Sequence, residues 1–378
     1  MKKALLALLL VFFSHFSFAQ PKTEKTILFL IPFFSDRIDE IDLLRITTDD
    51  DIYAITLFQL VAFWEGAQIA LDEFSSDDIQ LTVVVKDITD NETKLKSILE
   101  DHSLMEKVDL MIGPFFGNMF ELAASYALKY EIPIVNPFGS KRNFLKDNEF
   151  AYKLMPAADA APRLIVNQIK DDTSINILLW AEDDYQEDIE MYEKFFTQQN
   201  TPFSKIKFES GISNLTTQLK ENHNNIVVVS AKSQAKIIHN FRLLQSSANF
   251  PEYTIIVPEI WLAKNQSEIE TFNELKTCFF SNYFVDYNDE KTIYFISEFI
   301  ERYASPPDIS RFSFQGYDVV KYFLNCLVHN FDTSKFTFKP LSLGFDFLKL
   351  ENGGYENQKK RLLRLQDYTI IEVEQIHE

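Results

Sequence analysis

Two short turns in the sequence combine aromatic, glycine and polar residues in a pattern that suits the binding of a small molecule. The turn at 115–118 follows an apolar run at 108–113, and the turn at 138–140 follows another at 132–136. At the carboxyl ends of parallel strands, such turns lead into helices whose free backbone N–H groups can hold a ligand. We therefore expect both turns to face a binding cleft.

Aromatic residues are concentrated around the same turns. Their rings would form the wall of a cleft for an apolar, aromatic or sugar-like ligand, whereas the same rings can equally fill the core of a domain. The sequence leaves both interpretations open. The rings belong to Phe33, Phe34, Phe115, Phe116 and Phe138.

Enzyme motifs are absent from the sequence. It contains no G-x-S-x-G, H-E-x-x-H or Walker A segment, and no G-x-G-x-x-G after the first apolar run. Its histidines stand in helical or terminal stretches without a paired nucleophile. We therefore predict no catalytic residue, no cofactor and no metal centre.

An acidic stretch separates the first apolar run from the first helical pattern. Such a stretch can supply oxygen ligands to Ca²⁺, but the spacing of an EF-hand loop is missing, which favours a solvated loop. Because the loop follows a strand end, it can also act as a flap over the cleft. Its acidic residues are Asp36, Asp39, Glu40, Asp42, Asp49, Asp50 and Asp51.

Length and composition set the broad class of the protein. The 378 residues are 46% hydrophobic and 25% charged, which is enough for two domains with large cores. Only 9 Gly and 13 Pro stand against 36 Phe and 15 Tyr, which excludes collagen-like and low-complexity chains. The formal net charge of −19 excludes nucleic acid as a favoured partner.

The first 19 residues have the pattern of a secretory signal peptide. Lys2 and Lys3 precede an apolar run at 4–13, and small residues including Ser17 and Ala19 occupy the cleavage positions. The run is too short for a hydrocarbon core about 30 Å thick, and no cysteine stands near Ala19 for lipid attachment. We expect cleavage after Ala19 and an exported, soluble protein without stable membrane insertion.

Cys278 and Cys326 are the only cysteines. Export would permit a disulfide between them, but both stand in apolar, aromatic segments. This context favours buried, unpaired thiols, although the sequence does not exclude a bridge.

From Thr26 onward, short apolar runs alternate with helical periodicity, which is typical of βαβ units and a mostly parallel sheet. Buried strands are expected at 26–33, 79–87, 108–113 and 132–136, and the pattern restarts after Pro156. Helices are expected at 92–105, from Gly117 or Asn118 to about Lys129, and at 184–199, 232–246, 290–303 and 314–330. The sequence thus predicts two α/β lobes.

Several strings resemble the type I periplasmic solute-binding proteins, especially the branched-chain amino-acid-binding group of ABC transporter substrate-binding proteins. They are TILFLIPF, FWEGAQIALDEF, VVVKD, IGPFFGNMFELAA with YEIPIVNPFGS, QGYDVVKYFL and GFDFLKLENGGYEN. The pair IGP and IPIVNP is the most specific of these, and the resemblance covers nearly all of the mature chain.

The resemblance implies two Rossmann-like lobes joined by three hinge crossovers, with ligand bound between the lobes and the lobes closing around it. Lobe I would comprise 22–156 and 286–330, and lobe II would comprise 157–285 and 331–378. The amino-terminal segment 1–19 would be the signal peptide.

The same resemblance implies a set of ligand contacts. The first turn would contribute Phe116, Gly117 and Asn118, and the second would contribute Phe138, Gly139 and Ser140. From lobe II, Tyr185 with its neighbour Asp183 would reach the ligand, and Glu259 would pair with a ligand amine; Tyr185 packing on its own lobe and Glu259 complementing a helix dipole remain alternatives. The family's Ser and Thr hydroxyls are largely missing here, which puts amino-acid specificity in doubt.

The resemblance therefore implies a periplasmic protein that captures an amino-acid-like or other small polar or aromatic solute. It would deliver this solute to an inner-membrane ABC permease or a receptor. The alternative is a degenerate module that has lost solute binding and acts in protein interaction or regulation at the cell envelope.

Overall fold

A computed structural model gives the structure of the chain. It describes residues 23–40, 56–76, 79–115, 117–139, 141–169, 174–182, 186–246, 250–264, 268–308 and 311–376. The predicted signal peptide and the acidic residues Asp42 and Asp49 to Asp51 lie outside these ranges. Asp36, Asp39 and Glu40 lie on a short 3-10 helix, η1 (Ser35–Glu40).

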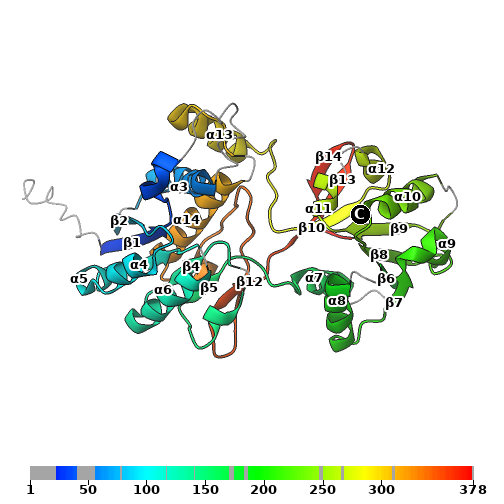
Figure 1. Cartoon of the computed structure of the whole chain (residues 1–378), viewed down its shortest axis with the longest axis horizontal. Helices are drawn as coiled ribbons and strands as arrows, with labels where there is room; N and C mark the ends of the chain where they lie inside the picture. Colours follow the sequence, from blue (N-terminus) through cyan, green and yellow to red (C-terminus); the bar gives the residue numbers. More distant parts are fainter. Residues whose placement is uncertain are drawn as a thin grey trace, which may run out of the picture.

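Two seven-stranded sheets organise the chain, and each forms the centre of one lobe (Figure 1). The sheet of lobe I has the order β11-β12-β5-β4-β3-β1-β2, and all its described pairings are parallel except β11 with β12. Its strands are β1 (Thr23–Ile31), β2 (Ile79–Asp87), β3 (Leu110–Ile112), β4 (Ile134–Asn136), β5 (Ala151–Lys153), β11 (Phe347–Lys349) and β12 (Tyr355–Asn357).

The sheet of lobe II repeats this plan, with the order β14-β13-β10-β9-β8-β6-β7. Its last two strands are antiparallel to their neighbours. The strands are β6 (Ile175–Ala181), β7 (Ser204–Lys207), β8 (Asn224–Ser230), β9 (Tyr253–Val257), β10 (Cys278–Ser281), β13 (Arg361–Gln366) and β14 (Thr369–Glu372).

Helices cover both sheets. Lobe I carries α3 (Thr56–Asp72), α4 (Glu92–Leu99), α5 (His102–Met105), α6 (Gly117–Tyr130), α13 (Glu290–Tyr303) and α14 (Phe312–Val328). Lobe II carries α7 (Ala160–Ile169), α8 (Gln186–Gln198), α9 (Gly211–Thr216), α10 (Gln234–Gln245), α11 (Ile260–Lys264) and α12 (Ile269–Glu274). None of these described helices is both long and apolar enough to cross a membrane.

Two details differ from the helices and strands expected from sequence. The single helix expected at 92–105 is divided into α4 and α5, because the Asp101 side chain accepts a hydrogen bond from Leu104 N and starts a new helix. Strand β2 is mostly exposed rather than buried, because it forms the edge of the sheet and, among the described strands, pairs with β1 alone.

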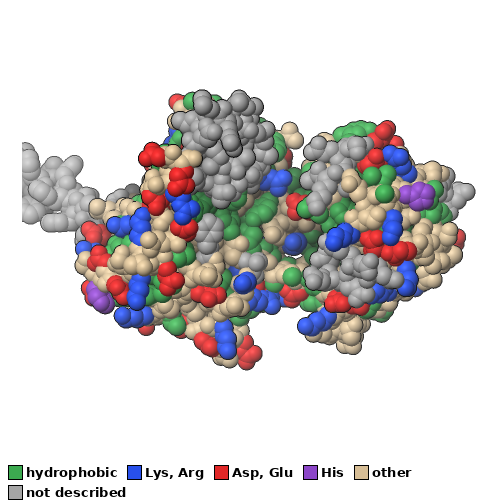
Figure 2. Space-filling view, in the orientation of Figure 1, with side chains coloured by type: hydrophobic (Ala, Val, Ile, Leu, Met, Phe, Trp, Pro, Cys, Tyr) green, Lys and Arg blue, Asp and Glu red, His purple; other side chains and the backbone are tan. Residues whose placement is uncertain are grey.

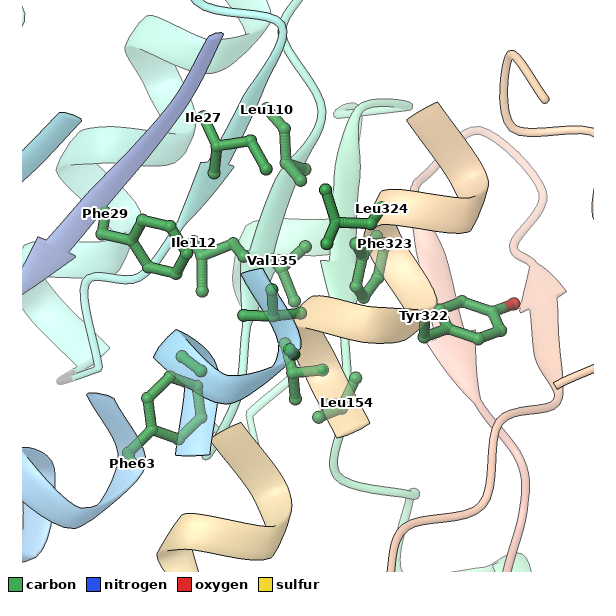
Figure 3. Packing of buried hydrophobic residues seen from close by; sticks show 14 of the residues in the cluster. Ile27, Phe29, Phe63, Leu110, Ile112, Val135, Leu154, Tyr322, Phe323 and Leu324 are labelled. Atoms are coloured by element: carbon green, nitrogen blue, oxygen red, sulfur yellow. The ribbon is translucent and has the colours of Figure 1, made fainter. Parts of the chain in front are cut away.

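One of the cores of lobe I lies between β1, β3 and β4 on one side and helices α3 and α14 on the other (Figure 3). The two helices meet at glycines. A Cβ atom on Gly66 would lie 1.8 Å from Ser313 O, and one on Gly316 would lie 1.8 Å from Phe63 O. Close helix contact therefore requires a residue without a side chain at both positions.

The chain crosses between the sheets three times, after β5, after β10 and after β12. This topology corrects the predicted lobe boundaries, because 331–357 belongs to lobe I and not to lobe II. Strand β12 pairs with β5, and Phe336, Phe345 and Phe347 pack around Tyr322 of α14.

The three crossing segments contact one another. Tyr283 Oη of the second crossing donates to Met155 Sδ of the first at 3.0 Å, and Lys360 Nζ of the third donates to Asn282 Oδ1 of the second at 3.0 Å. Phe284 N of the second crossing donates to Ser342 O of lobe I at 3.0 Å. These bonds join the crossings into one waist between the lobes.

The segment beside the second crossing is held by Asp318 of α14. Its fully buried carboxylate accepts hydrogen bonds from Leu341 N, Ser342 N and Leu343 N at 2.7, 2.7 and 2.8 Å. Burial raises the pKa of Asp318 to about 6, and the backbone donors oppose that rise.

Cys278 and Cys326 are both buried and unpaired, which confirms the interpretation favoured from sequence. Cys278 lies in β10 of lobe II and Cys326 in α14 of lobe I.

Candidate functional site

The first predicted turn of lobe I lies at the carboxyl end of β3. Phe115 is only 4% exposed and packs edge-on against Phe63 of α3, with ring centroids 4.9 Å apart. Gly117 and Asn118 are exposed at the start of α6, so neither precedes that helix as a cap. Phe116 lies outside the described residues.

The second predicted turn is held by a residue that the sequence analysis did not single out. Asn136, the last residue of β4, accepts hydrogen bonds through Oδ1 from Phe138 N at 3.1 Å and Gly139 N at 2.5 Å. These are backbone donors that were expected to serve a ligand anion, so Asn136 competes with any such ligand. An Asn that ends a buried strand is the sequence signal for this turn. Ser140 lies outside the described residues.

The aromatic residues of lobe I divide between core and surface. Phe34 and Phe115 are buried, at 8% and 4% exposure, whereas Phe33 and Phe138 are half-buried. The Phe138 ring packs on Phe115 at 5.3 Å and on Phe312, which starts α14, at 5.1 Å. Lobe I therefore presents an aromatic, largely filled surface at its strand ends.

Lobe II has a hollow in the corresponding place. A cavity of about 270 Å³ lies at the carboxyl ends of β8 and β9, between these strands and helices α7 and α8. Its wall is mainly apolar, and its charged groups are Glu259 and Lys360. The apolar lining includes Ala158, Ala161, Ile189, Met191, Tyr192 and Phe280.

Glu259, predicted from sequence, is exposed in the turn after β9 and accepts a hydrogen bond from Ser281 Oγ at 2.9 Å. Lys360 stands in the third crossing and was not predicted. Burial lowers the pKa of Lys360, and the Glu259 carboxylate opposes that shift. Sequence offered no signal for Lys360, because its role depends on where the chain crosses between the lobes.

A second cavity, of about 620 Å³, adjoins the first and shares Ala158 and Met191 with it. Arg142 of lobe I lines one side, and Met191, Lys194, Phe195 and Gln198 of α8 line the other. This cavity therefore lies between the two lobes. Figure 2 shows hydrophobic side chains gathered on the lobe I side of the waist, with both basic and acidic side chains between the lobes.

Arg142 belongs to a chain of charges that passes from lobe I to lobe II. Its guanidinium binds the buried Glu356 carboxylate through Nε at 2.8 Å and Nη2 at 2.5 Å, and Lys153 Nζ lies 3.2 Å from the same carboxylate. Arg142 Nη2 also lies 3.5 Å from Asp159 Oδ1, just before α7. The two ion pairs lower the pKa of Glu356 against the effect of burial.

Asp183 and Tyr185 lie outside the described residues, between β6 and α8. The preceding residue, Glu182, has a structural role. Its carboxylate accepts hydrogen bonds from Lys232 N at 2.7 Å and Ser233 N at 3.1 Å and pairs with Lys236 at 2.8 Å. These contacts lower the pKa of Glu182 although burial acts in the opposite direction. Within the described ranges, no three His, Cys, Asp or Glu side chains are grouped as metal ligands.

Comparison with known proteins connects this geometry to a fold. No protein-family model and no curated protein matches the sequence. A solved structure of a candidate branched-chain amino acid ABC transporter from Rhodospirillum rubrum matches over 93% of this chain and 100% of its own, at 12% identity and a TM-score of 0.62. The chain has the type I periplasmic-binding-protein fold.

Two further structures have the same architecture. A branched-chain amino acid ABC transporter periplasmic ligand-binding protein from Burkholderia xenovorans matches over 92% of this chain and 94% of its own, at 12% identity and a TM-score of 0.53. LpoA from Haemophilus influenzae matches over 94% of this chain and 60% of its own, at 13% identity and a TM-score of 0.56. Type I periplasmic-binding architecture thus occurs both in transporter-associated proteins and as part of a longer chain.

Proposed function

We propose that this protein binds a small solute between its two lobes and delivers it to a membrane transporter or receptor. The observation that carries this proposal is the cavity at the carboxyl ends of β8 and β9, which contains Glu259 and Lys360 among apolar side chains. A mainly apolar hollow with a few polar groups at strand ends is the usual form of a small-molecule site in α/β proteins.

The waist supports closure of the lobes around the solute. Three crossings connect the lobes, and hydrogen bonds from Tyr283 Oη to Met155 Sδ and from Lys360 Nζ to Asn282 Oδ1 link these crossings. Such an arrangement permits the lobes to rotate about the waist as units. Export by the signal peptide, a periplasmic location and an ABC-type permease or receptor as partner belong to the same proposal, as does the absence of catalysis.

The ligand contacts are proposed accordingly. Glu259 would accept a polar or cationic group of the solute, and Tyr185 with Asp183 would approach it from the segment between β6 and α8. The lobe I contacts would come from Phe116, Gly117, Asn118, Phe138, Gly139 and Ser140.

A second candidate function follows from Asn136. Because its side chain already accepts hydrogen bonds from Phe138 N and Gly139 N, lobe I has fewer donors for a ligand carboxylate. This supports a protein-interaction or regulatory role at the cell envelope in which solute binding has been lost.

A solute screen tests these functions. Trp261 is buried beside the turn that carries Glu259, so its fluorescence can report binding in lobe II. We expect a saturable change with at least one amino acid, nucleoside, sugar or small organic acid, and a decrease in the radius of gyration by small-angle X-ray scattering. No response across this panel, together with recovery of a defined envelope protein by pull-down, would favour the second function.

A further inference from the structure

The larger cavity has an uneven balance of charge. Four described basic residues, Arg142, Lys153, Arg163 and Lys194, line the cavity or pair with its charged residues, against two carboxylates, Asp159 and Glu356. Arg163 pairs with Asp159 at 2.6 Å. Arg142 and Lys153 share the Glu356 carboxylate, and Arg142 Nη2 also lies 3.5 Å from Asp159 Oδ1. Lys194, on the lobe II side, forms no ion pair with a described residue. The cavity therefore carries a local positive excess in a chain whose net charge is −19.

Arg142 is held in a fixed position. Its Nε and Nη2 atoms bind Glu356, whose carboxylate is buried and also contacts Lys153. Among the residues that the structure describes, none bonds to Arg142 Nη1, so this nitrogen can donate to a ligand. A guanidinium already fixed by one carboxylate loses little conformational freedom when it binds a second anion.

Lys194 stands opposite, on α8. Its side chain is exposed and forms no ion pair with a described residue, whereas the adjacent Glu193 is paired with Lys205 at 2.6 Å. The wall beside Lys194 is apolar, since it contains Met191 and Phe195. The same Met191 leads into the smaller cavity.

We propose that Arg142 and Lys194 bind the carboxylate or phosphate of an amphipathic anion whose apolar part lies over Ala158 and Met191. This inference rests on the proposed solute-binding function and adds the chemical class of the solute. The anion joins a cation of lobe I to a cation of lobe II, so binding draws the lobes together. The backbone donors of the 138–140 turn are not needed for this mode.

Calorimetry with three probes tests the inference on the full mature chain: 3-phenylpropionate, its neutral amide 3-phenylpropanamide, and phenyl phosphate. We expect at least one of the two anions to bind about tenfold more tightly than the amide, as a charge-assisted hydrogen bond requires. The anion that binds more tightly shows whether the site prefers a carboxylate or a phosphate.

Lys194→Ala is the main variant, because Lys194 is exposed and its loss should not disturb folding. We expect this variant to bind the preferred anion about tenfold more weakly and to bind the amide with unchanged affinity. Lys220→Ala, an exposed lysine of lobe II that lines neither cavity, is the matched control and should leave both affinities unchanged. Arg142→Gln should act like Lys194→Ala, with circular dichroism checking its fold.

Equal affinity for anion and amide, or an equal effect of Lys194→Ala and Lys220→Ala, would overturn the anion site. Solute capture would then still stand if another solute gave a saturable signal in the wider screen. Absence of binding by all three probes at millimolar concentration would also overturn the anion site, whereas only a silent wider screen would count against solute capture.

Discussion

The two lobes share one plan but differ where their strands end. In lobe I, Phe115 and Phe138 pack with Phe63 and Phe312, and Asn136 occupies the backbone donors of the second turn. In lobe II, the same level of the sheet contains a cavity with Glu259 and Lys360. If the proposed function holds, the lobes have unequal parts in recognition: lobe I would supply a preformed aromatic wall, and lobe II would supply the cavity and its charged groups.

The largest expected effect concerns the buried charges behind Arg142. Glu356→Gln leaves Lys153 and Arg142 without their shared carboxylate, so we expect a loss of about 3 kcal/mol in the free energy of unfolding, measured with urea. Glu149→Gln is the control, because Glu149 forms only an exposed pair with Lys349 and should cost less than about 0.5 kcal/mol. Equal effects would mean that the charge chain does not stabilise lobe I.

The next effect concerns the contact between α3 and α14. Gly316→Ala places a Cβ atom against Phe63 O, so we expect the free energy of unfolding of lobe I to fall by about 2 kcal/mol. Gly117→Ala, with no atom within 4 Å of its added Cβ, is the control. Trp64 reports lobe I, while Trp180 and Trp261 report lobe II. Selective replacement of these tryptophans should show unfolding of lobe I at lower urea; coincident shifts in both lobes would contradict independent cores.

A smaller effect concerns the pH dependence of stability, which should differ between the two lobes. The folded pKa of Asp318 is raised from 3.8 to about 6, so its contribution to stability is largest at low pH and declines as the pH rises through 6. Between pH 7.5 and 5.0 we expect Asp318 to add about 1.4 kcal/mol to the free energy of unfolding. This gain should be absent in Asp318→Asn when both proteins are unfolded with urea at the two pH values.

The contribution of Glu182 in lobe II to the free energy of unfolding has the opposite pH dependence. The folded pKa of Glu182 is lowered, so its stabilisation is lost as the pH falls. The Asp318→Asn comparison should therefore be made above pH 5, where Glu182 remains ionised. A wild-type curve with the same pH slope as the variant would show that Asp318 is not the source.

The smallest expected effect tests whether lobe II contributes more than lobe I to the free energy of solute binding. For a solute found in the screen, Glu259→Gln should weaken binding by about 1 kcal/mol, whereas Asn118→Ala on lobe I should change it by less than about 0.5 kcal/mol. Calorimetry gives both values. A larger effect of Asn118→Ala would reverse the assignment of roles.

Local features of the fold could be predicted from sequence. The α13 bounds agree with the predicted 290–303, because the apolar period of 3.6 and the Asp289 cap are both local signals. Strands β3 and β4 lie within the buried runs predicted at 108–113 and 132–136.

Contacts between distant parts of the chain could not be predicted. Arg142 and Glu356 are 214 residues apart, and no local pattern links them. The β11–β12 hairpin returns to lobe I because β12 satisfies the free edge of β5, which depends on the assembled sheet. For the same reason, Lys360 became visible as a site residue only in three dimensions, whereas the turn at Asn136 is local and has a sequence signal that the prediction missed.

The distribution of the two cysteines gives each lobe a natural chemical tag. Cys326 is buried in α14 of lobe I, and Cys278 is buried in β10 of lobe II. Burial raises the pKa of both thiols, to about 12 for Cys326. A thiol-reactive reagent should therefore modify a given lobe only after that lobe has opened. Mass spectrometry of the two tagged peptides would record the order in which the halves of the molecule come apart, without any engineered label.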